Sequence, residues 1–102
     1  MIFYNKLVRD KIPGIILSNG ETPVTRILEG KEYILQLEKK LDEEVAEYHD
    51  SKSIEELADI LEVVYALCEG AGYSVEDLLS AYREKNTERG GFSKKIFLIG
   101  KE

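Results

Sequence analysis

The sequence has few of the residues on which covalent catalysis or a disulfide framework depends. Among its 102 residues there is one cysteine, Cys68, and one histidine, His49. A single cysteine excludes an intramolecular disulfide, and the apolar pattern around Cys68 predicts a small core residue. His49 has no cysteine or second histidine nearby, so we expect a solvated residue at a helix end rather than a metal ligand. Because neither a Ser/His/Asp nor a Cys/His set is available, covalent catalysis is poorly supported.

Several classes of protein are disfavoured by motifs or apolar runs that are missing. No apolar run approaches the roughly 20 residues of a transmembrane helix, and charged residues interrupt the N-terminal apolar ones, unlike in a signal peptide. We therefore expect a cytoplasmic protein that does not bind a membrane. Neither a P-loop nor a GxGxxG sequence occurs. No internal repeat, linker or low-complexity segment divides the chain, which predicts a single domain over residues 1–102.

The net charge of −6 is unevenly distributed along the chain. Ten of the 20 acidic residues lie in residues 38–62, whereas residues 82–102 carry six basic and three acidic side chains. The overall acidity disfavours binding to a nucleic-acid polymer. An acidic centre with basic segments at both ends is instead suited to a metal ion and the phosphates of a small ligand.

Apolar periodicity and capping residues predict a mainly α fold with one short and three long helices. The expected helices cover residues 11–18, 31–49, 54–69 and 74–88. The helix over residues 54–69 is apolar around most of its circumference, and such a helix is buried on more than one side. A chain of 102 residues builds only a modest core of its own. We therefore expect a helical bundle that assembles as a homodimer or a dimer of dimers.

A minor two-strand element is also expected. Residues 24–28 alternate in polarity and contain β-branched side chains, which is typical of a short strand. Residues 95–99, at the other end of the chain, are its natural partner. Because an isolated strand pair is only marginally stable, this ribbon would need to pack on the helices.

Four carboxylates occupy positions where the helical pattern predicts apolar side chains. Glu44 and Glu47 lie toward the inner side of the first long helix, and Glu56 and Asp59 repeat the three-residue spacing on the second. Burying unpaired carboxylates is costly, so these acids need cations or hydrogen-bond donors as partners. Mg²⁺ prefers hard oxygen ligands and is the expected ion, with Mn²⁺ as the alternative. Glu56 also has a competing role, because it fits a capping box with Ser53.

These acids belong to a pattern that resembles a known family. Residues 43–47, Glu-Glu-Val-Ala-Glu, and residues 56–59, Glu-Leu-Ala-Asp, resemble the EExxE…ExxD signature of the MazG-like all-α nucleoside triphosphate pyrophosphohydrolases, which include the phosphoribosyl-ATP pyrophosphohydrolases. Residues 4–13, Tyr-Asn-Lys-Leu-Val-Arg-Asp-Lys-Ile-Pro, and residues 89–92, Arg-Gly-Gly-Phe, resemble a small single-domain branch of that superfamily. The core resemblance spans roughly residues 30–90. The interval between the acidic pairs is shorter than in the family, which leaves little room for a long connecting loop.

The resemblance implies hydrolysis of a nucleoside triphosphate, or of a phosphoribosyl-ATP-like nucleotide, between the α- and β-phosphates. The products would be a monophosphate and pyrophosphate, as in house-cleaning of the nucleotide pool. Glu44 would then serve as both a metal ligand and a catalytic residue. Glu43 would orient ligands or help to activate water, although a solvated acid is an equally good interpretation. The competing hypothesis is a catalytically silent, cation-binding helical dimer that acts as an interaction or regulatory module.

Cationic side chains are expected to complete the site. Four carboxylates and a triphosphate carry more negative charge than one or two Mg²⁺ ions neutralise. The candidates for binding substrate are Lys6 and Arg9 near the start of the chain, and Lys85 and Arg89 on one face of the last helix. The alternative for all four is an ordinary solvated surface charge.

Overall fold

The structure, a computed structural model that describes residues 1–102, contains four helices and no strand. The helices are α1 (Ile12–Ser18), α2 (Gly30–Ser51), α3 (Ile54–Gly70) and α4 (Val75–Arg89). Their bounds lie within two residues of those expected from the sequence, which confirms a mainly α fold. None of the four combines the length and the apolar character that a membrane-spanning helix would need.

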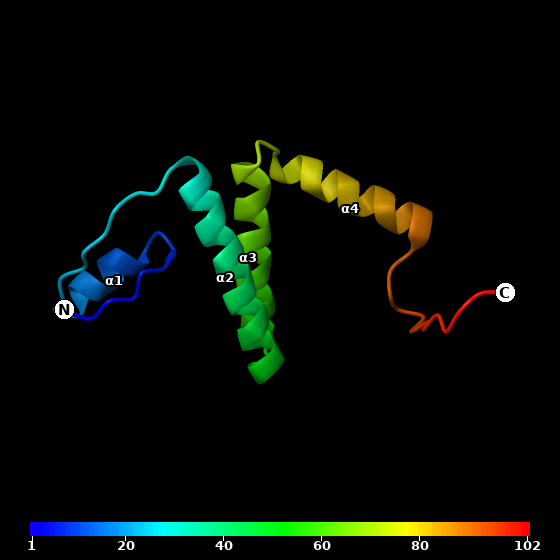
Figure 1. Ribbon diagram of the computed structural model, residues 1–102, viewed down its shortest axis with the longest axis horizontal. Helices are drawn as coiled ribbons and strands as arrows, with labels where there is room; N and C mark the ends of the chain where they lie inside the picture. Colours follow the sequence, from blue (N-terminus) through cyan, green and yellow to red (C-terminus); the bar gives the residue numbers. More distant parts are fainter.

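The antiparallel pair of α2 and α3 is the centre of the molecule (Figure 1). The chain reverses through Lys52, which has a left-handed backbone conformation with φ of 56°. Ser53 then begins α3, and its side-chain oxygen accepts a hydrogen bond of 3.4 Å from the backbone N–H of Glu56. Because only Lys52 and Ser53 separate the helices, the end of α2 lies beside the start of α3. These are the two segments that carry the predicted acidic pairs.

The helix pair encloses a very small core. Leu37 of α2 and Val63 of α3 are its buried apolar residues, and Glu44 is the only buried polar one. At the other end of the pair, Gly70 allows α3 to approach α2 closely, because a Cβ atom there would lie 2.7 Å from Cδ1 of Ile34. The side of α3 that contains Val63 is thus the one that packs within the chain.

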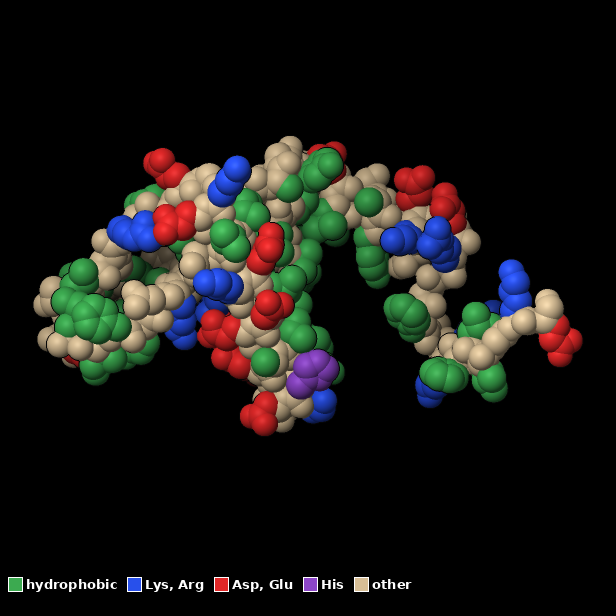
Figure 2. Space-filling view, in the orientation of Figure 1, with side chains coloured by type: hydrophobic (Ala, Val, Ile, Leu, Met, Phe, Trp, Pro, Cys, Tyr) green, Lys and Arg blue, Asp and Glu red, His purple; other side chains and the backbone are tan.

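A second apolar stripe of α3, which contains Ile54, Leu57 and Leu61, faces outward. Ile54, Leu57 and Leu61 are 76%, 48% and 49% exposed, although the sequence predicts burial on both sides of this helix. Figure 2 shows apolar side chains along the side of α3 that borders the open space next to α4. One of the two expected faces is therefore covered within the chain, and the other is left without a partner.

Helix α4 leaves the pair instead of completing a compact bundle (Figure 1). A capping box fixes its start, where Ser74 and Asp77 exchange hydrogen bonds of 2.9 and 3.1 Å. Beyond its first turn, α4 extends away from α2 and α3, and every residue from 80 onward is exposed. The radius of gyration is consequently 17.9 Å, compared with about 13 Å for a compact domain of this length.

The expected two-strand element is not present in this structure. Residues 24–28 and 95–99 have no regular secondary structure and lie at opposite ends of the molecule (Figure 1). The reason is the direction of α4, which carries the C-terminal segment away from residues 24–28. A strand pair gains its stability from packing on other elements, and neither segment has such support here.

Candidate metal centre

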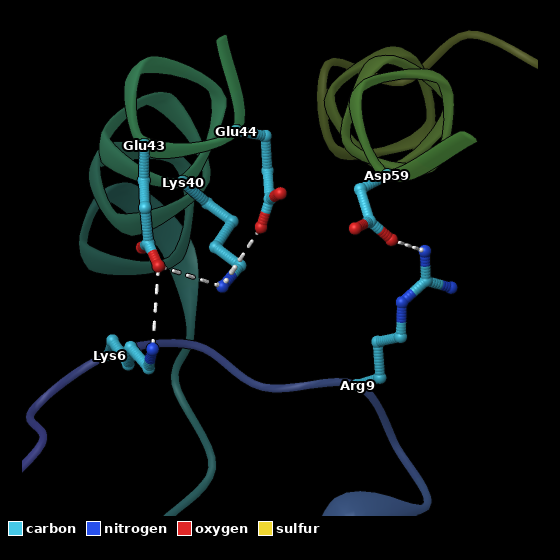
Figure 3. A network of polar contacts seen from close by, with 6 residues as sticks. All are labelled: Lys6, Arg9, Lys40, Glu43, Glu44 and Asp59. Carbon is cyan, nitrogen blue, oxygen red and sulfur yellow. Dashed lines mark hydrogen bonds and ion pairs between the residues drawn. The ribbon is translucent and has the colours of Figure 1, made fainter. Parts of the chain in front are cut away.

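Three of the four predicted acids come together between α2 and α3. Glu44 of α2 and Glu56 and Asp59 of α3 each contribute one carboxylate oxygen, and these three atoms all lie within 4.8 Å of one another. Figure 3 shows Glu44 and Asp59 projecting from the two helices into the space between them. The three-residue spacing on α3 places Glu56 and Asp59 about one turn apart, and the short reversal at Lys52 places both beside Glu44.

Glu44 is the most enclosed member of this cluster, with 6% of its surface exposed. Its Oε1 atom lies 3.3 Å from Nζ of Lys40, one turn earlier on α2. Its Oε2 atom is buried without a hydrogen-bond partner, and so is Oε2 of Glu56. Unsatisfied buried carboxylate oxygens are costly, and hard oxygen ligands of this type suit Mg²⁺ or Mn²⁺. The donor set therefore fits a divalent cation.

Crowding among the carboxylates changes the acidity of Glu56. Burial, and after it the neighbouring carboxylates of Glu44 and Glu47, together raise the pKa of this carboxyl to about 7. Part of the cluster consequently remains protonated near neutral pH when no cation compensates its charge. A cation at this position would favour the ionised form of Glu56.

The structure also resolves the competing role of Glu56 as a capping residue. A complete capping box requires the Glu56 side chain to accept from the backbone N–H of Ser53. That N–H instead donates to the side-chain oxygen of Ser51, at 3.3 Å. Ser53 caps the backbone of Glu56, but the Glu56 carboxylate is left free to join Glu44 and Asp59.

Replacing Glu56 with glutamine is expected to stabilise the cation-free protein at pH 8. Because the pKa of Glu56 rises from 4.5 to about 7 on folding, the contribution of Glu56 to the stability of the wild type is complete below about pH 4.5 and is lost as pH rises through 7. Glutamine does not ionise, so the variant avoids this loss. Thermal unfolding followed by circular dichroism in EDTA should give a higher Tm for Glu56→Gln at pH 8, by a few degrees, and similar values near pH 4.5.

The neighbouring exposed acid Glu55 provides the matched control for this measurement. Its replacement by glutamine should give no gain in Tm at pH 8, because Glu55 lies outside the carboxylate cluster. A Glu56→Gln variant that unfolds below the wild-type temperature at pH 8 would show that the ionised Glu56 side chain is not destabilising.

The other two predicted acids lie at the edge of the cluster. Glu47 is exposed and does not belong to the three-carboxylate group, although its charge acts on Glu56. Glu43 forms ion pairs with two lysines, with Oε1 at 3.4 Å from Nζ of Lys6 and 3.5 Å from Nζ of Lys40 (Figure 3). Glu43 therefore holds the side chains of these two lysines beside the carboxylate cluster, and it does not belong to the cluster itself.

The N-terminal arm, defined here as residues 1–11, brings both of its predicted cations to the acidic helices. Lys6 contacts Glu43, and Nη2 of Arg9 donates to Oδ1 of Asp59 at 2.6 Å (Figure 3). The hydrogen bond to Asp59 raises the pKa of Arg9 above its ordinary value. Two residues that are 37 and 50 positions from their partners in the sequence thus contact the acidic helices, and Arg9 contacts the three-carboxylate cluster itself.

Lys40 is a site residue that sequence reasoning missed. Its Nζ atom lies between Glu43 and Glu44, and its side chain is 19% exposed. The available signal was its spacing of three and four residues before these acids, which places all three side chains on one helical face.

Lys85 and Arg89 are not brought to the cluster of the same chain. Both lie in the exposed outer part of α4, which points away from α2 and α3 (Figure 1). Within a single chain, the cationic surroundings of the acids are therefore Lys6, Arg9 and Lys40.

Comparison with known proteins finds one similar stretch of sequence. An uncharacterized protein of Mycolicibacterium smegmatis is 57% identical over 42 residues, which cover 41% of this chain and 43% of that protein. The matched region is therefore less than half of the relative's length. No family model matches the chain, and no solved structure matches it.

Proposed function

We propose that this chain is a Mg²⁺-dependent pyrophosphohydrolase that cleaves a nucleoside triphosphate, or a phosphoribosyl-ATP-like nucleotide, between its α- and β-phosphates. The observation that carries the proposal is the three-carboxylate cluster, in which buried oxygens of Glu44 and Glu56 have no partner within the chain. The resemblance of its acidic motif to the MazG-like family supplies the reaction and the site of cleavage. In this proposal the protein acts in the cytoplasm on the nucleotide pool, in a house-cleaning role.

The residues of the centre divide into two functional groups. Glu44, Glu56 and Asp59 would hold Mg²⁺, with the exposed Glu47 available as a further ligand beside Glu56. The bound ion would neutralise the triphosphate and lower the pKa of an attacking water. Glu43, held by lysines at the rim of the cluster, would orient that water.

A groove beside the cluster offers space for the rest of a nucleotide. Its volume is about 810 Å³, and it lies between the N-terminal arm with α1 and the face of α2 and α3. Such volumes are typical of small-molecule sites. Tyr33, Leu37, Lys40 and Glu44 follow one another along its α2 wall, so the wall changes from apolar to charged. The apolar part would accommodate the base or sugar, and the charged part would accommodate the phosphates.

We also propose that a second copy of the chain completes the fold. The single chain exposes 9246 Å², about 3,400 Å² more than the roughly 5,800 Å² expected of a compact 11.6 kDa monomer. This excess is several times the ~800 Å² per partner of a standard interface. The outward stripe of Ile54, Leu57 and Leu61 would be covered by the copy, as a dimer or a dimer of dimers.

The second copy also gives Lys85 and Arg89 a route to a metal centre. Because α4 points away from the acids of its own chain, these cations can reach only the phosphates bound by another copy. In the dimer we therefore assign them to substrate binding in trans, beside the Lys6 and Arg9 of the chain that holds the metal.

The competing function is a catalytically silent helical dimer that binds a structural cation and serves as an interaction or regulatory module. The same unsatisfied carboxylates support it, since cation binding alone would satisfy them. The two functions differ in chemistry, because only the enzyme releases pyrophosphate.

Incubation with a panel of nucleoside triphosphates and Mg²⁺ tests the proposed enzyme. We expect stoichiometric pyrophosphate and nucleoside monophosphate for at least one substrate, and no product when EDTA removes the cation. Release of inorganic phosphate and a diphosphate would contradict cleavage between the α- and β-phosphates. Binding of Mn²⁺ without any hydrolysis across the panel, with phosphoribosyl-ATP included, would favour the silent dimer.

A further inference from the structure

We propose that Arg9 competes with the divalent cation for Asp59, so that cation binding releases the N-terminal arm from the metal centre. The inference rests on the proposed metal site and adds a means of regulating it. In the cation-free chain the Arg9 guanidinium supplies a positive charge at one corner of the cluster. When a cation binds, the arm and its two basic side chains become free to move.

The geometry places Arg9 in the position of a competitor. Its Nη2 atom donates to Oδ1 of Asp59 at 2.6 Å, and Asp59 is one of the three acids that converge between the helices. Figure 3 shows the guanidinium reaching Asp59 from the arm, on the side of the helix pair where Lys6 meets Glu43. These two ion pairs are the side-chain hydrogen bonds that join the arm to α2 and α3.

A divalent cation and the Arg9 guanidinium are not compatible neighbours at this carboxylate. Both are positively charged, and like charges a few ångströms apart near a protein surface repel strongly. An Asp59 oxygen that coordinates the ion also loses much of its attraction for Arg9. Binding of the cation therefore weakens the contact of Arg9 with Asp59, and the contact of Arg9 weakens binding of the cation by the same free energy.

Arg9 is more easily displaced than the other cation in contact with the cluster. Lys40 is 19% exposed and is anchored on α2 one turn from Glu44, so its charge stays near the site in both states. Arg9 is 56% exposed and lies on a segment without regular secondary structure. Loss of its single strong contact with Asp59 costs the fold little.

Displacement of Arg9 from Asp59 by the cation affects the order in which the cation and the nucleotide bind. Leu7, Val8 and Arg9 of the arm line the 810 Å³ groove beside the cluster. While Arg9 is bound to Asp59, it is not available to an anionic ligand in this groove. Once the cation has bound, the released guanidinium can pair with phosphates, so the cation should bind first and the nucleotide second.

Titration with Mn²⁺ alone tests the competition. We expect Arg9→Gln to bind Mn²⁺ between about 1.5-fold and fivefold more tightly than the wild type. This range corresponds to the free energy of one exposed ion pair, which the cation no longer has to break. Arg26→Gln is the matched control, because Arg26 pairs with Glu32 near the start of α2, about 18 Å along the helix from Glu44. Its affinity should equal that of the wild type. Unchanged or weaker binding by Arg9→Gln would overturn the proposal.

Limited trypsin digestion supplies a readout on the arm itself. Mn²⁺ should accelerate cleavage after Lys6 in the wild type severalfold, whereas Arg9→Gln should be cleaved rapidly with or without the ion. Cleavage after the exposed Lys94 and Lys95 serves as the internal reference for trypsin activity. Slower arm cleavage in the presence of Mn²⁺ would overturn the release of the arm.

The two proposals fail in different ways. A wild type that binds no Mn²⁺ would remove the metal site and the competition together. A wild type that binds Mn²⁺ and releases pyrophosphate, with no effect of Arg9→Gln on affinity, would remove only the role of Arg9.

Discussion

Glu44→Gln is expected to lose divalent-cation binding at the centre and to reduce pyrophosphate release by at least about a hundredfold. Loss of an outer partner alone typically costs a metal site 10- to 100-fold, and Glu44 is the most buried of the three converging carboxylates. Glutamine has nearly the same shape and removes a negative charge that faces Glu56 and Asp59. Helix content should therefore be retained, and repulsion within the cation-free cluster should decrease.

Mn²⁺ titration, a pyrophosphate assay and far-ultraviolet circular dichroism together check this expectation. Glu38→Gln is the matched control, since Glu38 is an exposed acid on the same helix and should bind Mn²⁺ as the wild type does. Lys40 retains an ion-pair partner in Glu43 when Glu44 is replaced, so it is not left as an isolated charge. Full affinity and activity in both Glu44→Gln and Asp59→Asn would place the metal site elsewhere.

Leu61→Lys is expected to convert a dimer into monomers at micromolar concentration. Leu61 is 49% exposed in the single chain and lies one turn from Leu57 on the outward stripe of α3. A buried leucine contributes roughly 1.5–3 kcal/mol, and placing an unpaired charge in an apolar interface costs further free energy. Because a symmetric dimer contains the substitution twice, the dimer dissociation constant should increase by at least a hundredfold, or ~2.7 kcal/mol.

Light scattering coupled to size-exclusion chromatography measures the change directly. The wild type should elute with a mass of at least two chains, whereas Leu61→Lys should shift toward one. Val24→Lys is a useful control, because Val24 is 74% exposed and lies in the segment between α1 and α2, away from the outward stripe. A monodisperse monomer for the wild type would contradict the proposed assembly, and an unchanged dimer in Leu61→Lys would place the interface on another surface.

Local signals in the sequence were sufficient to locate the helices. Ser53 and Ser74 begin α3 and α4 as expected, and their side chains accept hydrogen bonds from the following helical turn. These signals are readable because capping depends on residues only a few positions apart. The prediction of a strand over residues 24–28 was wrong for the opposite reason. A strand requires a distant partner, and α4 carries the expected partner, residues 95–99, to the other end of the molecule.

The acidic centre was predictable only in part. Spacing along each helix and the short reversal between them indicated that Glu44, Glu56 and Asp59 would meet, and the structure brings these three together. Spacing also grouped Glu47 with them, but its side chain remains exposed at the rim. Helical periodicity fixes the direction of a side chain only to within tens of degrees, which is too coarse to separate a buried ligand from its exposed neighbour.

What the sequence determined by itself is therefore the set of helices and the two segments that carry the acids, because both follow from contacts between residues close in the chain. Tertiary structure alone decided that Arg9 contacts Asp59 and that α4 points away from the site. These features depend on contacts between distant segments or on side-chain positions within a packed pair of helices. Several such arrangements satisfy the same local pattern, and only the packing of the whole chain selects among them.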